Sequence, residues 1–195
     1  GGDNQGKVVI KDIKGEEVES RKLEKQPGGL EGTMVAGGFG DRGGEGMILT
    51  GKNAREKKRP YFGICLGMQC MVIEFARNVC GLPGATSEEF DAKAADTVIY
   101  LLTDWHDHRA ERHEKRDAQS DLGGTMRLGS YPCRLVSGTL AYKAYKEAEI
   151  SERHRHRFEF NNNYYDLMKE KGLIFGGLSP DHTLVEMVEL PAKEH

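Results

Sequence analysis

The chain has 195 residues, of which 37% are hydrophobic and 30% charged, a composition typical of a globular domain with a charged surface. Its 28 lysines and arginines nearly balance 31 aspartates and glutamates, giving a net charge of -3, which argues against nucleic-acid binding through a basic surface. No apolar run is long enough to span a membrane, and the start of the chain lacks the pattern of a signal peptide. The four cysteines lack zinc-ligand spacing and indicate free thiols in a reducing, cytoplasmic compartment.

Strand and helix signals alternate in the first half of the chain. Apolar residues over 68–79 recur with the 3.6-residue period of a helix, and Pro60 ends the helix before them. In chain order, the pattern predicts a strand at Val8–Ile10, a helix at Glu16–Lys25, a strand at Thr33–Ala36, a helix at Gly44–Arg59, a strand at Tyr61–Cys65, a helix over 68–79 and a strand at Thr97–Leu102.

The second half begins with a polar stretch, Trp105 to Asp121, which predicts an exposed loop with solvated His106, His108 and His113. Shorter elements follow it: strands at Tyr131–Val136, Ile150–Phe160, Leu173–Leu178 and Leu184–Leu190, and helices near 139–146 and 163–171. This order predicts an α/β fold with a central, mostly parallel sheet flanked by helices and an added antiparallel portion. We expect a single domain over residues 1–195.

The strongest chemical signal is the segment 63–69, Gly-Ile-Cys-Leu-Gly-Met-Gln, in which Cys65 falls between a strand and a helix. This is the arrangement of a nucleophile elbow with cysteine in place of serine. A thiol at a helix N-terminus has a lowered pKa, and the amides that follow it can bind an oxyanion. The alternative is a small buried core residue, which is how we interpret Cys70, Cys80 and Cys133.

A second signal is the glycine-rich turn 37–44, Gly-Gly-Phe-Gly-Asp-Arg-Gly-Gly, which follows a predicted strand. Its backbone N–H groups could bind a phosphate or an oxyanion. The turn is neither a Walker loop, since no Gly-Lys-Ser/Thr follows, nor a GxGxxG motif. By itself it could be only a turn.

Together, these segments resemble the glutamine amidotransferase domain of the CTP synthase family over residues 8–195. Further segments that carry the resemblance are 55–58 (Arg-Glu-Lys-Lys), 123–129 (Gly-Gly-Thr-Met-Arg-Leu-Gly) and 152–162 (Glu-Arg-His-Arg-His-Arg-Phe-Glu-Phe-Asn-Asn). The resemblance implies a class I glutamine amidotransferase fold, which is flavodoxin-like. It also implies that ammonia released from L-glutamine passes to an N-terminal synthetase domain outside this chain.

The resemblance implies roles for individual residues. Cys65 would form a glutamyl thioester, with the amides of Gly38 and Leu66 as the oxyanion hole. Glu89 would meet the α-ammonium of glutamine and Arg157 its α-carboxylate. The full set of substrate-binding residues is Gly38, Leu66, Gly67, Met68, Gln69, Glu89 and Arg157. Arg42 and Arg116 fall near segments linked with stimulation by GTP.

The same resemblance implies that this domain needs no cofactor or metal of its own. ATP, UTP and Mg²⁺, with GTP as effector, would act in the full-length enzyme, expected to be a homotetramer that aminates UTP to CTP. Without the family, the segment 153–157 (Arg-His-Arg-His-Arg) reads as a solvated edge strand. His154 and His156 would face the same side of it, but no third ligand with metal-site spacing is present.

Two departures from the family pattern affect these expectations. Class I amidotransferases complete a Cys-His-Glu triad with a late His-Pro-Glu element, which these 195 residues do not contain. His182 lies in a predicted turn and does not replace it. The strand and helix that open the family's domain are also not visible, so the domain is expected to be incomplete at both ends and of low activity by itself. The alternatives are a stand-alone cysteine hydrolase of γ-glutamyl amides and a catalytically inert regulatory module of the same fold.

Overall fold

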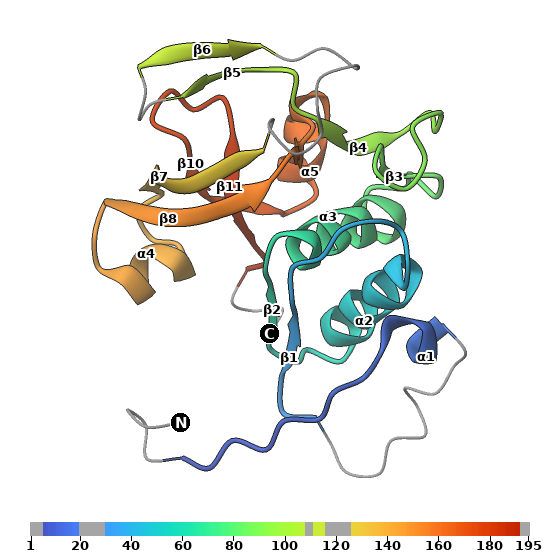
Figure 1. Ribbon diagram of the computed structural model, residues 1–195. Helices are drawn as coiled ribbons and strands as arrows, with labels where there is room; N and C mark the ends of the chain where they lie inside the picture. Colours follow the sequence, from blue (N-terminus) through green and yellow to red (C-terminus); the bar gives the residue numbers. More distant parts are fainter. Residues whose placement is uncertain (1–5, 20–29, 108–110, 116–125, 192–195) are drawn as a thin grey trace.

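A computed structural model describes residues 6–19, 30–107, 111–115 and 126–191. The first part of the chain folds as alternating helices and strands (Figure 1). Its elements are α1 (Gly15–Glu19), β1 (Thr33–Val35), α2 (Gly44–Glu56), β2 (Tyr61–Gly63), α3 (Leu66–Asn78), β3 (Thr86–Ser87) and β4 (Thr97–Leu101).

The second part is rich in strands, as the change of pattern predicts. Its elements are β5 (Asp104–Asp107), β6 (Arg112–Lys115), β7 (Arg127–Leu135), α4 (Leu140–Tyr145), β8 (Glu149–His156), β9 (Phe158–Phe160), the 3-10 turn η2 (Asn162–Tyr164), α5 (Tyr165–Glu170), β10 (Ile174–Leu178) and β11 (Val185–Glu189). The predicted strand Ile150–Phe160 is therefore divided at Arg157, and the predicted helix over 163–171 begins with the 3-10 turn.

Parallel and antiparallel strands occur in separate groups. Parallel pairing joins β1 to β2 and β3 to β4, and β9 extends the second pair in the antiparallel sense. The largest sheet among the described residues is antiparallel, with the strand order β11-β10-β7-β8. The prediction of an α/β fold with an added antiparallel portion is confirmed, and the antiparallel portion is the larger contributor to the sheets.

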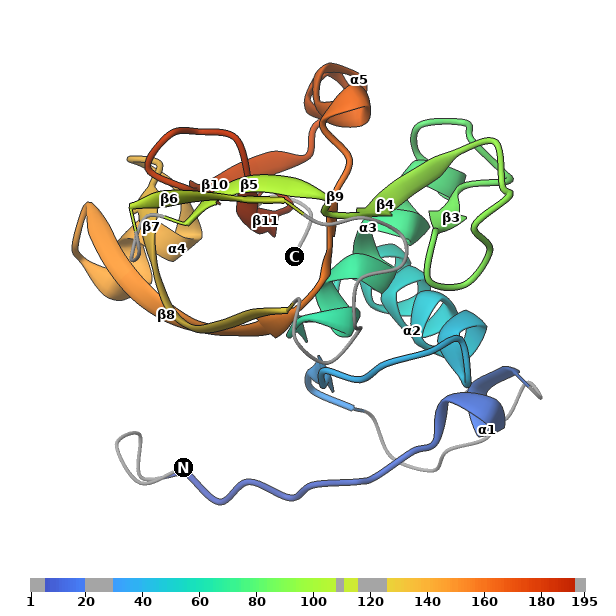
Figure 2. The ribbon, with the colours of Figure 1, turned by 45° about the horizontal axis from the view of Figure 1, so that its top comes forward.

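Helix α3 forms the centre of the main core. It lies beside α2 on one side and the β1–β2 pair on another (Figures 1 and 2). Val72, Ile73 and Ala76 are fully buried, because nearly every side of the helix is covered. The one buried acid of this helix, Glu74, forms an ion pair with Arg55 of α2 at 2.7 Å, which satisfies a charge that burial would otherwise penalise.

Two predictions about local structure are wrong. Val8–Ile10 forms no strand and is exposed, since no described strand lies beside it to complete its hydrogen bonds. The polar stretch after Trp105 contains the hairpin β5–β6 in place of a loop. Trp105 anchors this hairpin, because its side chain is buried with Leu102 and Leu184 in a small apolar cluster.

Other predictions in these regions are met in part. His113 is exposed, as predicted, but His106 is half-buried against it with ring centroids 5.2 Å apart. His108 lies outside the described residues, as do residues 20–25 of the predicted first helix. The two-residue strand β3 was not predicted, because so short an element leaves no periodic signal. None of the helices in the described ranges is both long and apolar enough to cross a membrane.

Candidate active site around Cys65

Cys65 occupies a sharp turn between β2 and α3. Its φ of 54° and ψ of -111° place a non-glycine residue in a backbone conformation that side chains rarely adopt. Such strain costs roughly 1–3 kcal/mol and persists where the surrounding structure enforces it. As the residue that immediately precedes α3, Cys65 lies at the positive end of the helix dipole. The predicted sharp turn from strand to helix at Cys65 is present, and the role of Cys65 as nucleophile stays a prediction.

Two glycines make the turn sterically possible. A Cβ added to Gly63 would lie 2.6 Å from the carbonyl carbon of Gly67, and one added to Gly67 would lie 2.2 Å from the carbonyl oxygen of Val35. The Tyr61 hydroxyl donates a hydrogen bond of 2.8 Å to the Gly67 carbonyl. The turn is therefore clamped between β1, β2 and the first turn of α3, with no room for a side chain at either glycine.

The glycine-rich turn after β1 lies directly against the elbow. A Cβ built on Gly37 would be 3.2 Å from the Cβ of Cys65 and 3.8 Å from its Sγ, and one built on Gly38 would be 3.2 Å from Leu66 Cδ2. Leu66 is the first residue of α3, so its N–H has no acceptor within the helix. The structure thus brings together the three residues that the resemblance assigns to thioester chemistry.

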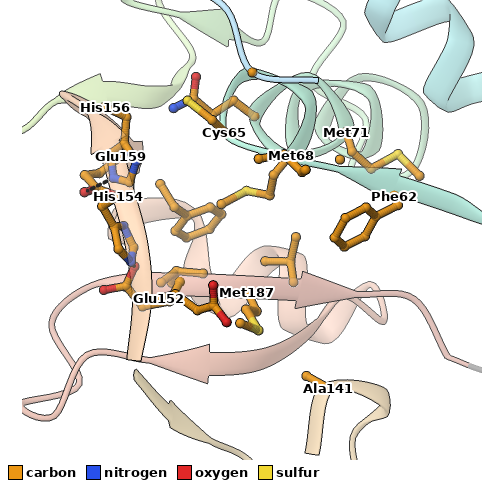
Figure 3. A pocket seen from close by; sticks show the side chains of 18 of the residues that line it. Phe62, Cys65, Met68, Met71, Ala141, Glu152, His154, His156, Glu159 and Met187 are labelled. Atoms are coloured by element: carbon orange, nitrogen blue, oxygen red, sulfur yellow. Dashed lines mark hydrogen bonds and ion pairs between the residues drawn. The ribbon is translucent and has the colours of Figure 1, made fainter. Parts of the chain in front are cut away.

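Cys65 opens onto a cavity of about 1030 Å³ between α3 and the strands β8 and β11. Met68 and Met71 extend into it from α3, whereas Glu152 and His156 line it from β8 and Met187 from β11 (Figure 3). The thiol is half-buried and not sealed in the core. The other cysteines lie in different surroundings: burial raises the pKa of the Cys70 and Cys133 thiols to about 12.

The predicted substrate-binding residues next to Cys65 and in the glycine-rich turn separate into two groups. Gly38, Met68 and Gln69 line the cavity, whereas Leu66 and Gly67 are buried beneath its wall. The Gln69 side chain already has a structural role, because its Nε2 donates a hydrogen bond of 2.8 Å to the carbonyl oxygen of Phe158. This bond joins α3 to β9 under the floor of the site.

Glu89 and Arg157 flank the glycine-rich turn and do not line the cavity itself. Glu89 Oε1 accepts a hydrogen bond of 2.8 Å from the N–H of Gly40. The Arg157 guanidinium lies 5.9 Å from the centre of the Phe39 ring, and its buried Nε has no hydrogen-bond acceptor among the described residues. An anion and a cation with an unused donor therefore lie next to the turn.

The remaining predicted positions contribute less to this site. Arg42 is exposed and forms an ion pair with Glu16, and Arg116 lies outside the described residues. His154 and His156 have ring centroids 5.0 Å apart, as their shared face predicts. No group of three metal-ligating side chains occurs within the part of the chain that the structure describes.

Sequence reasoning missed a buried charged network next to Cys65. His156 Nε2 lies 2.8 Å from Glu159 Oε1, Arg127 Nη1 lies 2.8 Å from the same oxygen, and Arg127 Nη2 lies 2.7 Å from Glu186 Oε1. Burial acts to lower the pKa of His156, but the charge of Glu159, the nearby thiol of Cys65 and the hydrogen bond to Glu159 raise it to about 10. The thiol itself contacts the carbonyl oxygen of Arg155 at 3.9 Å. The available signal was an acid three residues after a histidine at a strand end, which is too common to identify a network.

Comparison with known proteins identifies the class to which this site belongs. Residues 5–194 match the family described as glutamine amidotransferase class-I, and the chain belongs to that family. A solved structure of the glutaminase domain of Trypanosoma brucei CTPS with bound acivicin superposes with a TM-score of 0.83 at 33% identity, covering 97% of this chain and 70% of that one.

The relatives at higher identity narrow the comparison to one enzyme. The chain is 57% identical over 192 residues to the CTP synthase of Oleidesulfovibrio alaskensis, covering 98% of this chain and 35% of that protein. It is 60% identical over 162 residues to the CTP synthase of Lawsonia intracellularis, covering 83% and 30%. The chain thus spans about a third of the length of these curated relatives. The resemblance inferred from the sequence motifs is confirmed.

Proposed function

We propose that this chain is the glutaminase part of a CTP synthase and releases ammonia from L-glutamine through a thioester on Cys65. The observation that carries the proposal is the strained turn at Cys65, packed against Gly37 and Gly38 at the edge of a large cavity. The similarity to CTP synthases supports the choice among cysteine-dependent amide hydrolases.

The proposed chemistry uses groups that the site brings together. The thiolate of Cys65 attacks the side-chain amide carbon of glutamine, and the N–H groups of Gly38 and Leu66 stabilise the oxyanion. Collapse of the tetrahedral intermediate breaks the C–N bond, and the nitrogen takes one proton from water as it leaves as ammonia. Water then hydrolyses the thioester, giving glutamate and the free thiol.

The charges around the glycine-rich turn suit an amino acid substrate. Glu89 could pair with the α-ammonium while it holds Gly40, and Arg157 could bind the α-carboxylate through a bidentate contact. We expect Arg157→Lys to raise the KM for glutamine roughly tenfold with little change in kcat, because the amine cannot reproduce a planar two-point contact. An equal loss in kcat would argue that Arg157 acts on the reacting atoms instead.

The remaining parts of this proposal concern a longer protein, of which this chain would be one portion. A synthetase portion would receive the ammonia and use ATP and Mg²⁺ to convert UTP to CTP, with GTP as effector near Arg42 and Arg116. The longer protein is proposed to be a homotetramer and to lie in the cytoplasm. All four cysteines are free, which is compatible with a reducing compartment.

Labelling with acivicin tests the proposal directly. We expect one molecule of acivicin to attach to Cys65, glutamine to protect against it, and Cys65→Ser to abolish it. Cys70 and Cys133 serve as internal controls, because their buried thiols should stay unlabelled. Labelling of Cys65 without protection by glutamine would indicate a different cysteine hydrolase. No preference for Cys65 would indicate an inert module.

We also propose that residues 1–195 by themselves turn over glutamine slowly. They contain no His-Pro-Glu element, and general acid–base assistance is typically worth about 10²–10⁴-fold in rate. Ammonia release from this polypeptide should therefore fall short of release from the encoded full-length protein by about that factor. Comparable rates per site would refute this part of the proposal.

A further inference from the structure

The network behind Cys65 connects the nucleophile to the antiparallel sheet. Figure 3 shows His156 beside Cys65 and joined to Glu159 on the side away from the helix. Glu159 is 3% exposed and cannot rely on water to balance its charge. The Glu159 oxygen bonded to His156 is shared with Arg127, and that arginine also binds Glu186.

Each charged group that faces His156 can be assigned a sign. Glu159 on β9 is the nearest, at 2.8 Å, and favours a protonated imidazole. Arg127 on β7 opposes that proton, but its own charge is matched by Glu159 and Glu186. His154 on β8 lies 5.0 Å away, ring centre to ring centre, and is itself 3.6 Å from Glu186. Burial raises the pKa of Glu186, so Glu159, whose oxygen is shared with Arg127, is the anion that favours a proton on His156.

Cys65 is the group that such a charge would affect. Its thiol lies at the helix N-terminus, and the imidazole of His156 lies beside it (Figure 3), so a charged imidazole adds a second positive influence. A thiolate next to an imidazolium is stabilised by direct attraction and by hydrogen bonding. The pair is partly shielded from water, which strengthens the attraction.

We propose that His156, held in its protonated form by Glu159, is a positioning residue that stabilises and orients the thiolate of Cys65. The inference rests on the proposed role of Cys65 as nucleophile. His156 is not the general base of the reaction, because it already carries its proton. The thiol proton leaves to solvent or to another base, and the remaining charge on sulfur is paired with the imidazolium.

The test measures thiol chemistry and not glutamine turnover. Alkylation of Cys65 by iodoacetamide, followed by peptide mass spectrometry from pH 5 to pH 10, reports the thiolate fraction in the encoded full-length protein. We expect His156→Asn to move the midpoint of this profile upward by about one pH unit, with a roughly tenfold loss of rate at neutral pH. His182→Asn is the matched control, because His182 is exposed in a turn and is not among the residues that line the cavity.

Two further variants separate charge from packing. His156→Lys keeps a cation next to Glu159 and should restore most of the rate at neutral pH. Glu159→Gln leaves the imidazole in place but removes its anion, and should shift the profile as His156→Asn does. Profiles of His156→Asn and His182→Asn that coincide would overturn the proposal.

A measurement on the unmodified protein covers the case in which a variant fails to fold. The ¹⁵N chemical shifts of the His156 ring should indicate an imidazolium at pH 7.5, whereas a neutral ring would overturn the proposal. Neither measurement requires glutamine. Loss of glutamine protection in the acivicin experiment would therefore reject the proposed function without deciding the role of His156, and the reverse also holds.

Discussion

Replacing Gly67 with alanine sets two physical effects against each other. Gly67 is the second residue of α3, where alanine would ordinarily favour the helix by up to about 1 kcal/mol. The new Cβ would, however, lie 2.2 Å from the carbonyl oxygen of Val35 and 2.9 Å from its carbonyl carbon. Because the obstacle is backbone on β1, relief requires α3 and β1 to separate by roughly 1 Å.

The steric contact of the added Cβ with Val35 should destabilise the protein more than the helix preference of alanine stabilises it. Overpacking of this kind costs roughly 1–3 kcal/mol, and each kcal/mol lowers Tm by about 2–4 °C in a domain of this size. Activity should suffer more than stability. Val35 leads into the turn that contains Gly38, and a 1 Å misplacement of catalytic groups can cost about 10²-fold in rate.

Thermal unfolding and glutaminase assays of the encoded protein check both expectations, with Gly84→Ala as the control. Gly84 has no neighbouring atom within 4 Å of an added Cβ and no left-handed φ, so its substitution should change stability by no more than about 0.5 kcal/mol. A Gly67→Ala protein as stable and as active as Gly84→Ala would refute the steric argument.

The charged network supplies two further predictions. Arg127→Met should lower the free energy of unfolding by about 3–5 kcal/mol, because it removes the guanidinium that pairs with both buried carboxylates, Glu159 and Glu186; urea unfolding measures this, and a loss below 1 kcal/mol would contradict it. Stability should also fall at both ends of the pH range. Burial acts to raise the pKa of Glu159, but His156 and Arg127 hold it at about 2, so its contribution is complete above its ordinary value of 4.5 and is lost as the pH falls through 2. The raised pKa of His156 makes its contribution complete below 6.5, and that contribution is lost as the pH rises through about 10. Urea unfolding of wild type and Glu159→Gln across pH 2–10 checks the signs, and parallel pH profiles for the two proteins would contradict the assignment.

The elements that could be predicted from sequence are those with a local cause. The 3.6-residue period over 68–79, the proline at 60 and the glycines around Cys65 each act within a few residues, so the elbow and its helix were predicted correctly. The hairpin at Trp105 could not be predicted in this way. Its stability depends on burial of that side chain with Leu184, which is distant in the sequence.

The same distinction applies to the site. Proximity of Gly38 to the elbow was implied by the resemblance to the family, but the partners of His156 come from separate strands whose register only the fold establishes. The polar composition near Trp105 was a misleading guide, because one large apolar side chain outweighed many exposed charges.

The pairing of β7 with β8 has a consequence for how this protein tolerates change. His154 stands opposite Gly129, and His156 opposite Arg127, while the neighbouring arginines of β8 are exposed. Side chains alternate along a strand, so adding or deleting one residue before His154 would exchange the inner and outer sets together. Point replacements of the outward arginines should therefore be accepted far more readily during evolution than any change in the length of this ribbon.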